Sequence, residues 1–246
     1  MYINEYGDKS SPKILMLHPM EVTGDDLYHL FSKHLSQEYY CISPDQGGHG
    51  KSKGYISAQA EVKELADYLV KNNLFEFDLL YAASMGCAIA VQLIQDKRFT
   101  FKKIWFDGCF ISEKGGVMNW MMRNMFLKKL KQFEKNPELE PTNLIKLYGK
   151  DMGYMMKNNF VKFSKEDITN ICYACCHYKL AETDDEIQDR IHIEWGENDM
   201  DYKSSRKGMI KYYPKVVPVI RNGYGHCGYM AFETKKYVSE IEEFMA

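Results

Sequence analysis

The chain has 246 residues, of which 45% are hydrophobic and 27% are charged, and its formal net charge is −2 at pH 7. This composition is typical of a globular protein with a substantial core, built as one large domain or as one domain with an insertion. Because 32 basic and 34 acidic residues are intermixed, we expect no nucleic-acid partner. No apolar run has the length of a signal peptide or a membrane span, so we expect a cytoplasmic protein without membrane association.

The predicted elements alternate between strands and helices. In chain order, short apolar runs predict an edge strand at 2–7 and further strands at 13–18, 39–44, 77–83, 102–107, 191–195 and 215–220. Amphipathic stretches predict helices at 25–37, 58–73 and 85–98 and a closing helix at 237–244. This alternation predicts an α/β fold with a mostly parallel central sheet, helices on both faces, and ligands at the carboxyl ends of the strands.

The alternation stops between Ile111 and Asp189. This span is rich in Met, Tyr, Phe and Lys and has helical periodicity without a convincing strand. Pro137 and Pro141 are expected to separate two of its helices. We therefore predict that residues 111–189 form a helical insertion, and that residues 1–110 and 190–246 form the core domain.

The seven cysteines do not suggest a disulfide framework, because their number is odd and the chain is large. Cys172 and Cys175 form a C-x-x-C pattern, but His177 comes one residue too late for a haem-attachment motif, and no second cysteine pair completes a zinc site. We interpret the cluster as thiols buried on a helix face.

Ser84 lies at the end of a predicted strand, in the sequence FDLLYAASMGCAIAVQLI. Ala82 and Gly86 place small residues two positions before and after it, which is what a tight strand-to-helix turn requires. Such a turn exposes the hydroxyl and directs the first helix amides toward it, so that the N–H of Met85 could stabilise an oxyanion. The alternative is a serine that only packs beneath a helix.

A nucleophilic serine needs a nearby base and an acid to orient that base. His226, in the loop sequence NGYGHCGY before the last predicted helix, is the candidate base. Asp199, just after the strand IHIEW, is the candidate acid, with Asp201 and Asp107 as alternatives. His18 and His49 belong to turn sequences and are expected to brace loops, while Cys87 and Cys227 are expected to fill space beside the candidate site.

Four stretches in this order resemble the α/β-hydrolase superfamily over nearly the whole chain: LMLHPM, DQGGHGKS, AASMG, and WGEND together with GYGHCGY. The resemblance implies that Ser84 is the nucleophile, His226 the general base and acid, and Asp199 the orienting acid. It also implies that the span 111–189 is a helical cap over the site, whose methionines would suit a pliable apolar pocket wall.

The resemblance assigns the second oxyanion amide to Met20, since it follows the pair His18-Pro19, where relatives usually have His-Gly. If the register slipped by one, Pro19 would occupy the donor position, and proline has no N–H. Ala82 replaces the commoner glycine at the start of the turn.

We expect a serine hydrolase without metal or cofactor, acting on a small or medium carboxylic ester or thioester with an apolar portion. The alternatives are another reaction on the same fold, such as C–C hydrolysis, lyase or acyltransferase chemistry, or a non-catalytic receptor.

Overall fold

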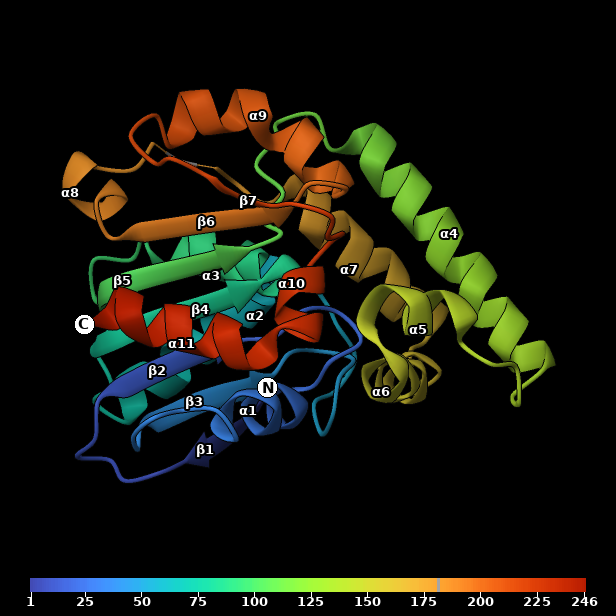
Figure 1. The fold of residues 1–246 in the computed structure, drawn as a ribbon, viewed down its shortest axis with the longest axis horizontal. Helices are drawn as coiled ribbons and strands as arrows, with labels where there is room; N and C mark the ends of the chain where they lie inside the picture. The colour runs from blue at the N-terminus through green and yellow to red at the C-terminus, as the bar shows by residue number, and fades with distance from the viewer. Residues whose placement is uncertain (181) are drawn as a thin grey trace.

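The computed structural model describes residues 1–180 and 182–246. Seven strands in this part of the chain form one sheet in the order β1-β3-β2-β4-β5-β6-β7 (Figure 1). β1 pairs antiparallel with β3, and every other pair is parallel. The strands are β1 (Tyr2–Tyr6), β2 (Lys13–Leu17), β3 (Tyr40–Asp45), β4 (Glu76–Ala83), β5 (Thr100–Asp107), β6 (Ile191–Gly196) and β7 (Val219–Arg221).

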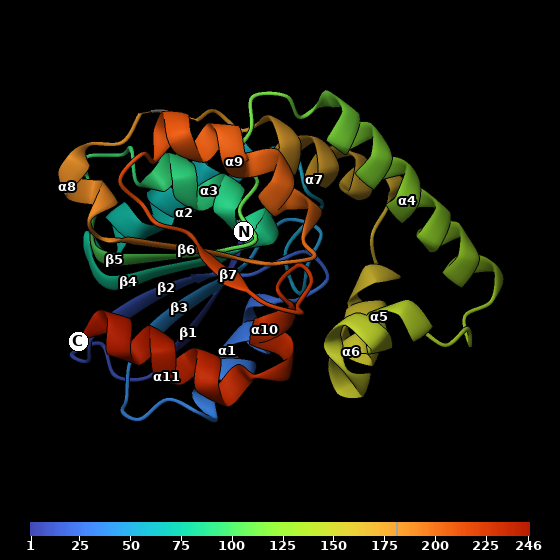
Figure 2. The same cartoon turned by 45° about the horizontal axis from the view of Figure 1, so that its top comes forward.

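Helices cover both faces of this sheet (Figure 2). One face carries α1 (Gly24–Ser32), α10 (Gly228–Phe232) and α11 (Thr234–Met245), and the other carries α2 (Ala58–Lys71), α3 (Cys87–Leu93) and α9 (Met200–Tyr212). The one-turn helix α8 (Asp185–Gln188) precedes β6. Among the described helices, none is both long and apolar enough to cross a bilayer.

The core consists of two apolar clusters, one on each side of the sheet. Successive residues of a strand point to opposite faces, and β2 follows this rule: Leu15 and Leu17 belong to one cluster, and Ile14 and Met16 to the other. Because both faces of the sheet are covered, β2 is apolar and buried on both sides from Ile14 to Leu17.

Four longer helices lie between β5 and β6 in the sequence, beyond the carboxyl ends of the strands (Figures 1 and 2). They are α4 (Gly116–Lys135), α5 (Thr142–Tyr148), α6 (Lys150–Phe160) and α7 (Lys165–His177). α4 ends before Pro137, and α5 begins directly after Pro141. Gly149 has a φ of +82° at the break between α5 and α6.

Three local expectations differ from the structure. The strand predicted at 215–220 is short, because Pro218 has no N–H to donate and pairing begins at Val219. The closing helix begins at Thr234, and α10 precedes it. Helix α9 was not predicted, because two of its four buried residues are small and give no apolar stripe: Ser205 donates its hydroxyl to Cys109 O, and a Cβ on Gly208 would collide with Ile111 O.

Candidate active site

Ser84 lies at the carboxyl end of β4, where the chain turns into the short 3₁₀ segment Ser84–Gly86 and then α3. Its φ is +48°, a left-handed conformation that is costly for a residue with a side chain and is found mainly at functional sites. The turn depends on small neighbours, since a Cβ on Gly86 would collide with the carbonyl oxygen of Leu17 on the adjacent strand. The local sequence therefore forms a tight strand-to-helix turn around one hydroxyl.

The structure brings Ser84, His226 and Asp199 together from three separate parts of the chain. His226 Nε2 lies 2.7 Å from Ser84 Oγ, and His226 Nδ1 lies 2.8 Å from Asp199 Oδ2. An ionised carboxylate can only accept hydrogen bonds, so Nδ1 carries a proton, and in the neutral imidazole Nε2 accepts from the serine hydroxyl. The three side chains form one chain of hydrogen bonds from carboxylate to imidazole to hydroxyl.

Asp199 has two hydrogen-bonding roles. Besides accepting from His226, its side chain accepts from the Asp201 N–H at 2.8 Å and so forms the N-cap of α9. Burial alone would raise the pKa of Asp199, but His226 and these hydrogen bonds hold it below the ordinary value of 3.8. Asp199 is therefore an anion at neutral pH.

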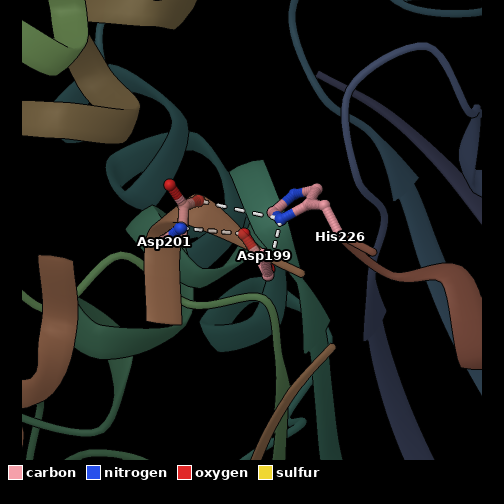
Figure 3. Close-up of side chains that lie close together, drawn as sticks. All are labelled: Asp199, Asp201 and His226. Atoms are coloured by element: carbon pink, nitrogen blue, oxygen red, sulfur yellow. Dashed lines mark hydrogen bonds and ion pairs between the residues drawn. The ribbon is translucent and has the colours of Figure 1, made fainter. Parts of the chain in front are cut away.

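Neither of the two alternative acids is hydrogen-bonded to His226 among the described residues. Asp201 is on the same side of the imidazole, 3.7 Å from His226 Nδ1 (Figure 3), and burial raises its pKa to about 6. Asp107, at the end of β5, is 2% exposed and accepts from Tyr237 at 3.1 Å, without a hydrogen bond to His226 among the described residues. Of the three carboxyls, Asp199 alone is hydrogen-bonded to the imidazole.

The charge of His226 is set by its surroundings. Burial lowers its pKa, but the adjacent Asp199 carboxylate outweighs that effect and raises the pKa well above 6.5.

His226, Asp199 and Asp201 each offer a ligand atom, and these atoms lie within 4.8 Å of one another (Figure 3). This grouping is the candidate metal site in the described ranges. To ligate an ion, His226 Nδ1 would have to lose the proton that it donates to Asp199. The hydrogen bond between them therefore argues against a metal at this position.

Met20 and Met85, whose N–H groups are the candidate oxyanion donors, belong to the same core cluster. The N–H of Met85 is at the start of a helical turn, where backbone donors lack intrahelical partners. The Pro19 carbonyl accepts from His18 Nδ1 at 2.9 Å and from the Val22 N–H at 3.4 Å. Because C=O and N–H point in opposite directions across a trans peptide, these bonds hold the Met20 N–H on the other side of that peptide.

His18 and His49 stabilise the loops beside the site. His18 Nε2 accepts from the Gln46 N–H at 2.9 Å, and His49 Nε2 accepts from the Glu21 N–H at 3.2 Å. Burial lowers their pKa values to about 4 and about 3, respectively, so both rings are neutral. Neither histidine is hydrogen-bonded to Ser84, which leaves His226 as its partner among the described residues.

Gly108, which follows β5, contributes to the site and was missed in the sequence. Its φ is +64°, and a Cβ there would lie 2.7 Å from His226 Cε1. The imidazole therefore packs against bare backbone, and a side chain at this position would displace it. The signal in the sequence was a glycine directly after the end of a strand, in FDG.

A second missed feature connects α4 to the loop that carries Met20. Glu21, 3% exposed and with a φ of +70°, pairs with Lys129 Nζ at 2.6 Å, and its carbonyl accepts from Asn159 Nδ2 at 3.1 Å. Two further residues of the inserted helices, Tyr148 and Cys175, lie within electrostatic range of His226. Burial raises the pKa of both side chains. The helices between β5 and β6 thus reach the neighbourhood of the candidate site.

Comparison with known proteins identifies the fold. Neither protein-family models nor curated protein sequences give a match. Solved structures do: an esterase from Exiguobacterium antarcticum has a TM-score of 0.72 at 16% identity, and the match covers 99% of this chain and 94% of that one. A bromoperoxidase from Bacillus anthracis has a TM-score of 0.74 at 15% identity, with 99% and 94% covered. MenH from S. aureus has a TM-score of 0.71 at 13% identity, with 99% and 97% covered.

Many of the matching structures are α/β hydrolases. The chain therefore has the α/β-hydrolase fold, as the motifs of its sequence predicted. At these identities the likeness shows the fold alone, and the reaction has to be argued from the residues of this chain.

Proposed function

We propose that the chain is a serine hydrolase, carboxylesterase-like in its chemistry, that cleaves carboxylic esters or thioesters through an acyl-enzyme on Ser84. The observation that carries this proposal is the hydrogen-bonded chain from Asp199 through His226 to Ser84, with separations of 2.8 and 2.7 Å. The strained backbone of Ser84 supports it, because a serine that only packed beneath a helix would gain nothing from a φ of +48°.

In the proposed reaction, His226 Nε2 takes the proton of Ser84 Oγ as the oxygen attacks the substrate carbonyl. Asp199 holds the Nδ1 tautomer and stabilises the imidazolium that forms. The N–H groups of Met85 and Met20 are the proposed donors to the tetrahedral oxyanion. His226 then protonates the leaving alcohol or thiol, and water activated by the same imidazole releases the acid from Ser84.

The proposed substrate is a small or medium ester with an apolar portion. We infer that the helices α4 to α7 form a cap over the site, since Tyr148 on α5 and Cys175 on α7 lie within electrostatic range of His226. Their buried apolar residues include Met152, Met156, Phe160 and Ile168. Methionine and aromatic side chains form adaptable apolar walls.

The test is labelling with a fluorophosphonate probe, which reacts with activated serines. We expect one covalent adduct, on Ser84, and its complete loss in Ser84→Ala. Peptide mapping by mass spectrometry locates the adduct. Ser205, buried and hydrogen-bonded to Cys109 O and Ile111 N, is a matched serine that should stay unlabelled.

Ester turnover separates hydrolysis from other chemistry on this fold. A panel of 4-nitrophenyl esters of rising acyl length should give turnover that falls in Ser84→Ala by about 10³-fold or more. An unlabelled Ser84 would favour a non-catalytic receptor. A labelled Ser84 without turnover of any ester would favour a lyase or an acyl transfer to an acceptor other than water.

A further inference from the structure

Arg123 on α4 is a half-buried cation without an anionic partner in the part of the chain that the structure describes. The chain has five arginines. Arg98, Arg190 and Arg221 each form an ion pair with a carboxylate, and Arg206 is exposed on α9. Arg123 makes no hydrogen bond or ion pair with any described residue, and its Nε is buried and unsatisfied. Such a group is costly in the folded protein unless a ligand completes it.

The side of α4 that carries Arg123 faces the protein. Met122, Phe126 and Leu127 pack against the core cluster that contains Met20 and Met85, and Leu130 and Phe133 are buried further along. Asn119 and Arg123 are four residues apart on this same face, so their side chains are neighbours. Asn119 Oδ1 is also buried, and no described residue is its hydrogen-bond partner. Two unsatisfied polar groups therefore lie together on an otherwise apolar helix face.

Helix α7 connects this pair to the candidate active site. The Met122 and Cys176 sulfur atoms are 3.8 Å apart, so α4 packs on α7 at this level. Burial raises the pKa of Cys172 on α7 to about 12, and the nearby Arg123 guanidinium opposes that rise. Cys175, one turn along α7, lies within electrostatic range of His226 and Asp201. Arg123 is thus separated from the His226 region by about one turn of α7.

We propose that Arg123 binds a carboxylate of the substrate, so that the preferred ester carries a negative charge remote from the scissile bond. Asn119 Oδ1 is an acceptor, so its part is to orient the guanidinium and not to bind the carboxylate. A planar guanidinium matches a carboxylate, with two parallel N–H donors. One cation balances one carboxylate, whereas a phosphate monoester would require more positive charge, and Lys129 is already paired with Glu21. This inference rests on the proposed function, because it names the substrate class of the same site.

The experiment compares esters of equal length with and without a carboxylate. Monomethyl adipate and monomethyl suberate carry the charge on the acyl part, and the acetyl ester of 6-hydroxyhexanoic acid carries it on the alcohol part. Methyl hexanoate, methyl octanoate and hexyl acetate are the neutral counterparts. Acid release is followed by titration at constant pH. In Arg123→Gln, kcat/KM for at least one anionic ester should fall about 10- to 100-fold, with neutral esters within about 3-fold.

Two further variants sharpen the result. Arg123→Lys should recover part of the preference, because it keeps the charge but not the paired donors. Arg206→Gln removes the same charge from an exposed position and should leave every anionic-to-neutral ratio unchanged. Arg123→Gln should unfold at the same or a higher urea concentration than the parent, since it removes an unpaired half-buried cation. Equal loss on charged and neutral esters would overturn the proposal.

A binding measurement keeps this inference separable from the proposed reaction. In Ser84→Ala, adipate should raise Tm more than hexanoate does, and the difference should vanish when Arg123→Gln is added. Inorganic phosphate at the same ionic strength should raise Tm less than adipate, and a larger effect of phosphate would contradict the carboxylate assignment. Adipate binding without fluorophosphonate labelling of Ser84 would leave an anion site in a protein that is not a serine hydrolase. Labelling without a charge preference would reject the anion site alone.

Discussion

His226 has two carboxylates beside its Nδ1 atom, and its charge state should govern the pH dependence of the proposed reaction. A base must be neutral to take the proton of Ser84, so kcat/KM should rise with pH through the pKa of His226. The Asp199 carboxylate raises this pKa well above 6.5 against the effect of burial. The second carboxylate, Asp201, lies 3.7 Å from Nδ1 and adds to the effect whenever it is ionised.

Asp201→Asn should therefore shift the rising limb of the kcat/KM profile to lower pH, by about 0.5 to 1 unit. Asp151→Asn, which removes an exposed carboxylate on α6, is the control and should leave the limb in place. The profile is measured with a neutral ester. A limb that moves upward in Asp201→Asn would contradict this assignment of the charges.

The residues that sequence analysis could find are those whose chemistry forms a pattern. Ser84 was recognisable from its small neighbours, and His226 from its glycine-rich loop near the end of the chain. Gly108 and Glu21 were missed, because their contacts are with His226 and Lys129, more than 100 positions away. Only the fold brings such pairs together.

At the scale of elements, the pair Glu21–Lys129 joins the inserted helix α4 to the loop that carries Met20. Glu21 is 3% exposed. Its Oε1 pairs with Lys129, and its Oε2 has no hydrogen-bond partner among the described residues, so loss of the lysine would leave a buried charge unpaired. Lys129→Met should lower the free energy of unfolding by about 3 kcal/mol, measured with urea at about pH 8. Lys128→Met, an exposed neighbour, should change it by about 0.5 kcal/mol or less.

The sign of the pH effect distinguishes this cause from lost packing. Burial raises the pKa of Glu21 above 4.5 in the folded protein, so in Lys129→Met the carboxyl can take up a proton as the pH falls. The stability deficit should therefore shrink at about pH 5. A deficit that is independent of pH would mean that the lysine stem contributes only by packing.

Periodicity located the elements that have apolar stripes and missed those held by small residues. α2 presents Leu65, Ala66 and Leu69 to the core, and its pattern was visible. α9 packs through Met209 and Tyr212 but also through Ser205 and Gly208, and the latter two carry no hydrophobic signal. Asp199 is the N-cap of α9, but in the sequence it was interpreted only as a site residue, so the start of the helix was not recognised.

At the scale of the whole molecule, the core excludes its thiols from solvent. Six cysteines are buried and Cys175 is partly buried, and all seven are free. Burial raises the pKa of Cys41, Cys172, Cys176 and Cys227 to about 12, which keeps them protonated and unreactive.

Ellman's reagent should accordingly modify at most one thiol quickly in the folded protein and all seven in denaturant. Adding a reducing agent should leave Tm unchanged, because no described cysteine pair is cross-linked. Rapid modification of two or more thiols without denaturant would show that the C-x-x-C segment is accessible in the folded protein. That result would favour a redox or metal-binding role for Cys172 and Cys175.

The overall architecture was predictable because alternating strands and helices allow few arrangements. The order β1-β3-β2-β4-β5-β6-β7 was not, since strand order depends on which faces the connecting helices cover. The same holds for the inserted helices: their existence followed from periodicity, whereas the contact of Lys129 with Glu21 follows from tertiary packing alone.

Asp199 both bonds to His226 and caps α9, and these two roles affect which substitutions this chain would tolerate over evolution. Because the carboxylate also starts α9, selection for solubility and folding would preserve it in a descendant that had lost all turnover. Ser84, whose backbone is strained at the end of β4, has no comparable structural role. In any lineage drifting away from chemistry, position 84 should be the first to relax to another amino acid, long before position 199 does.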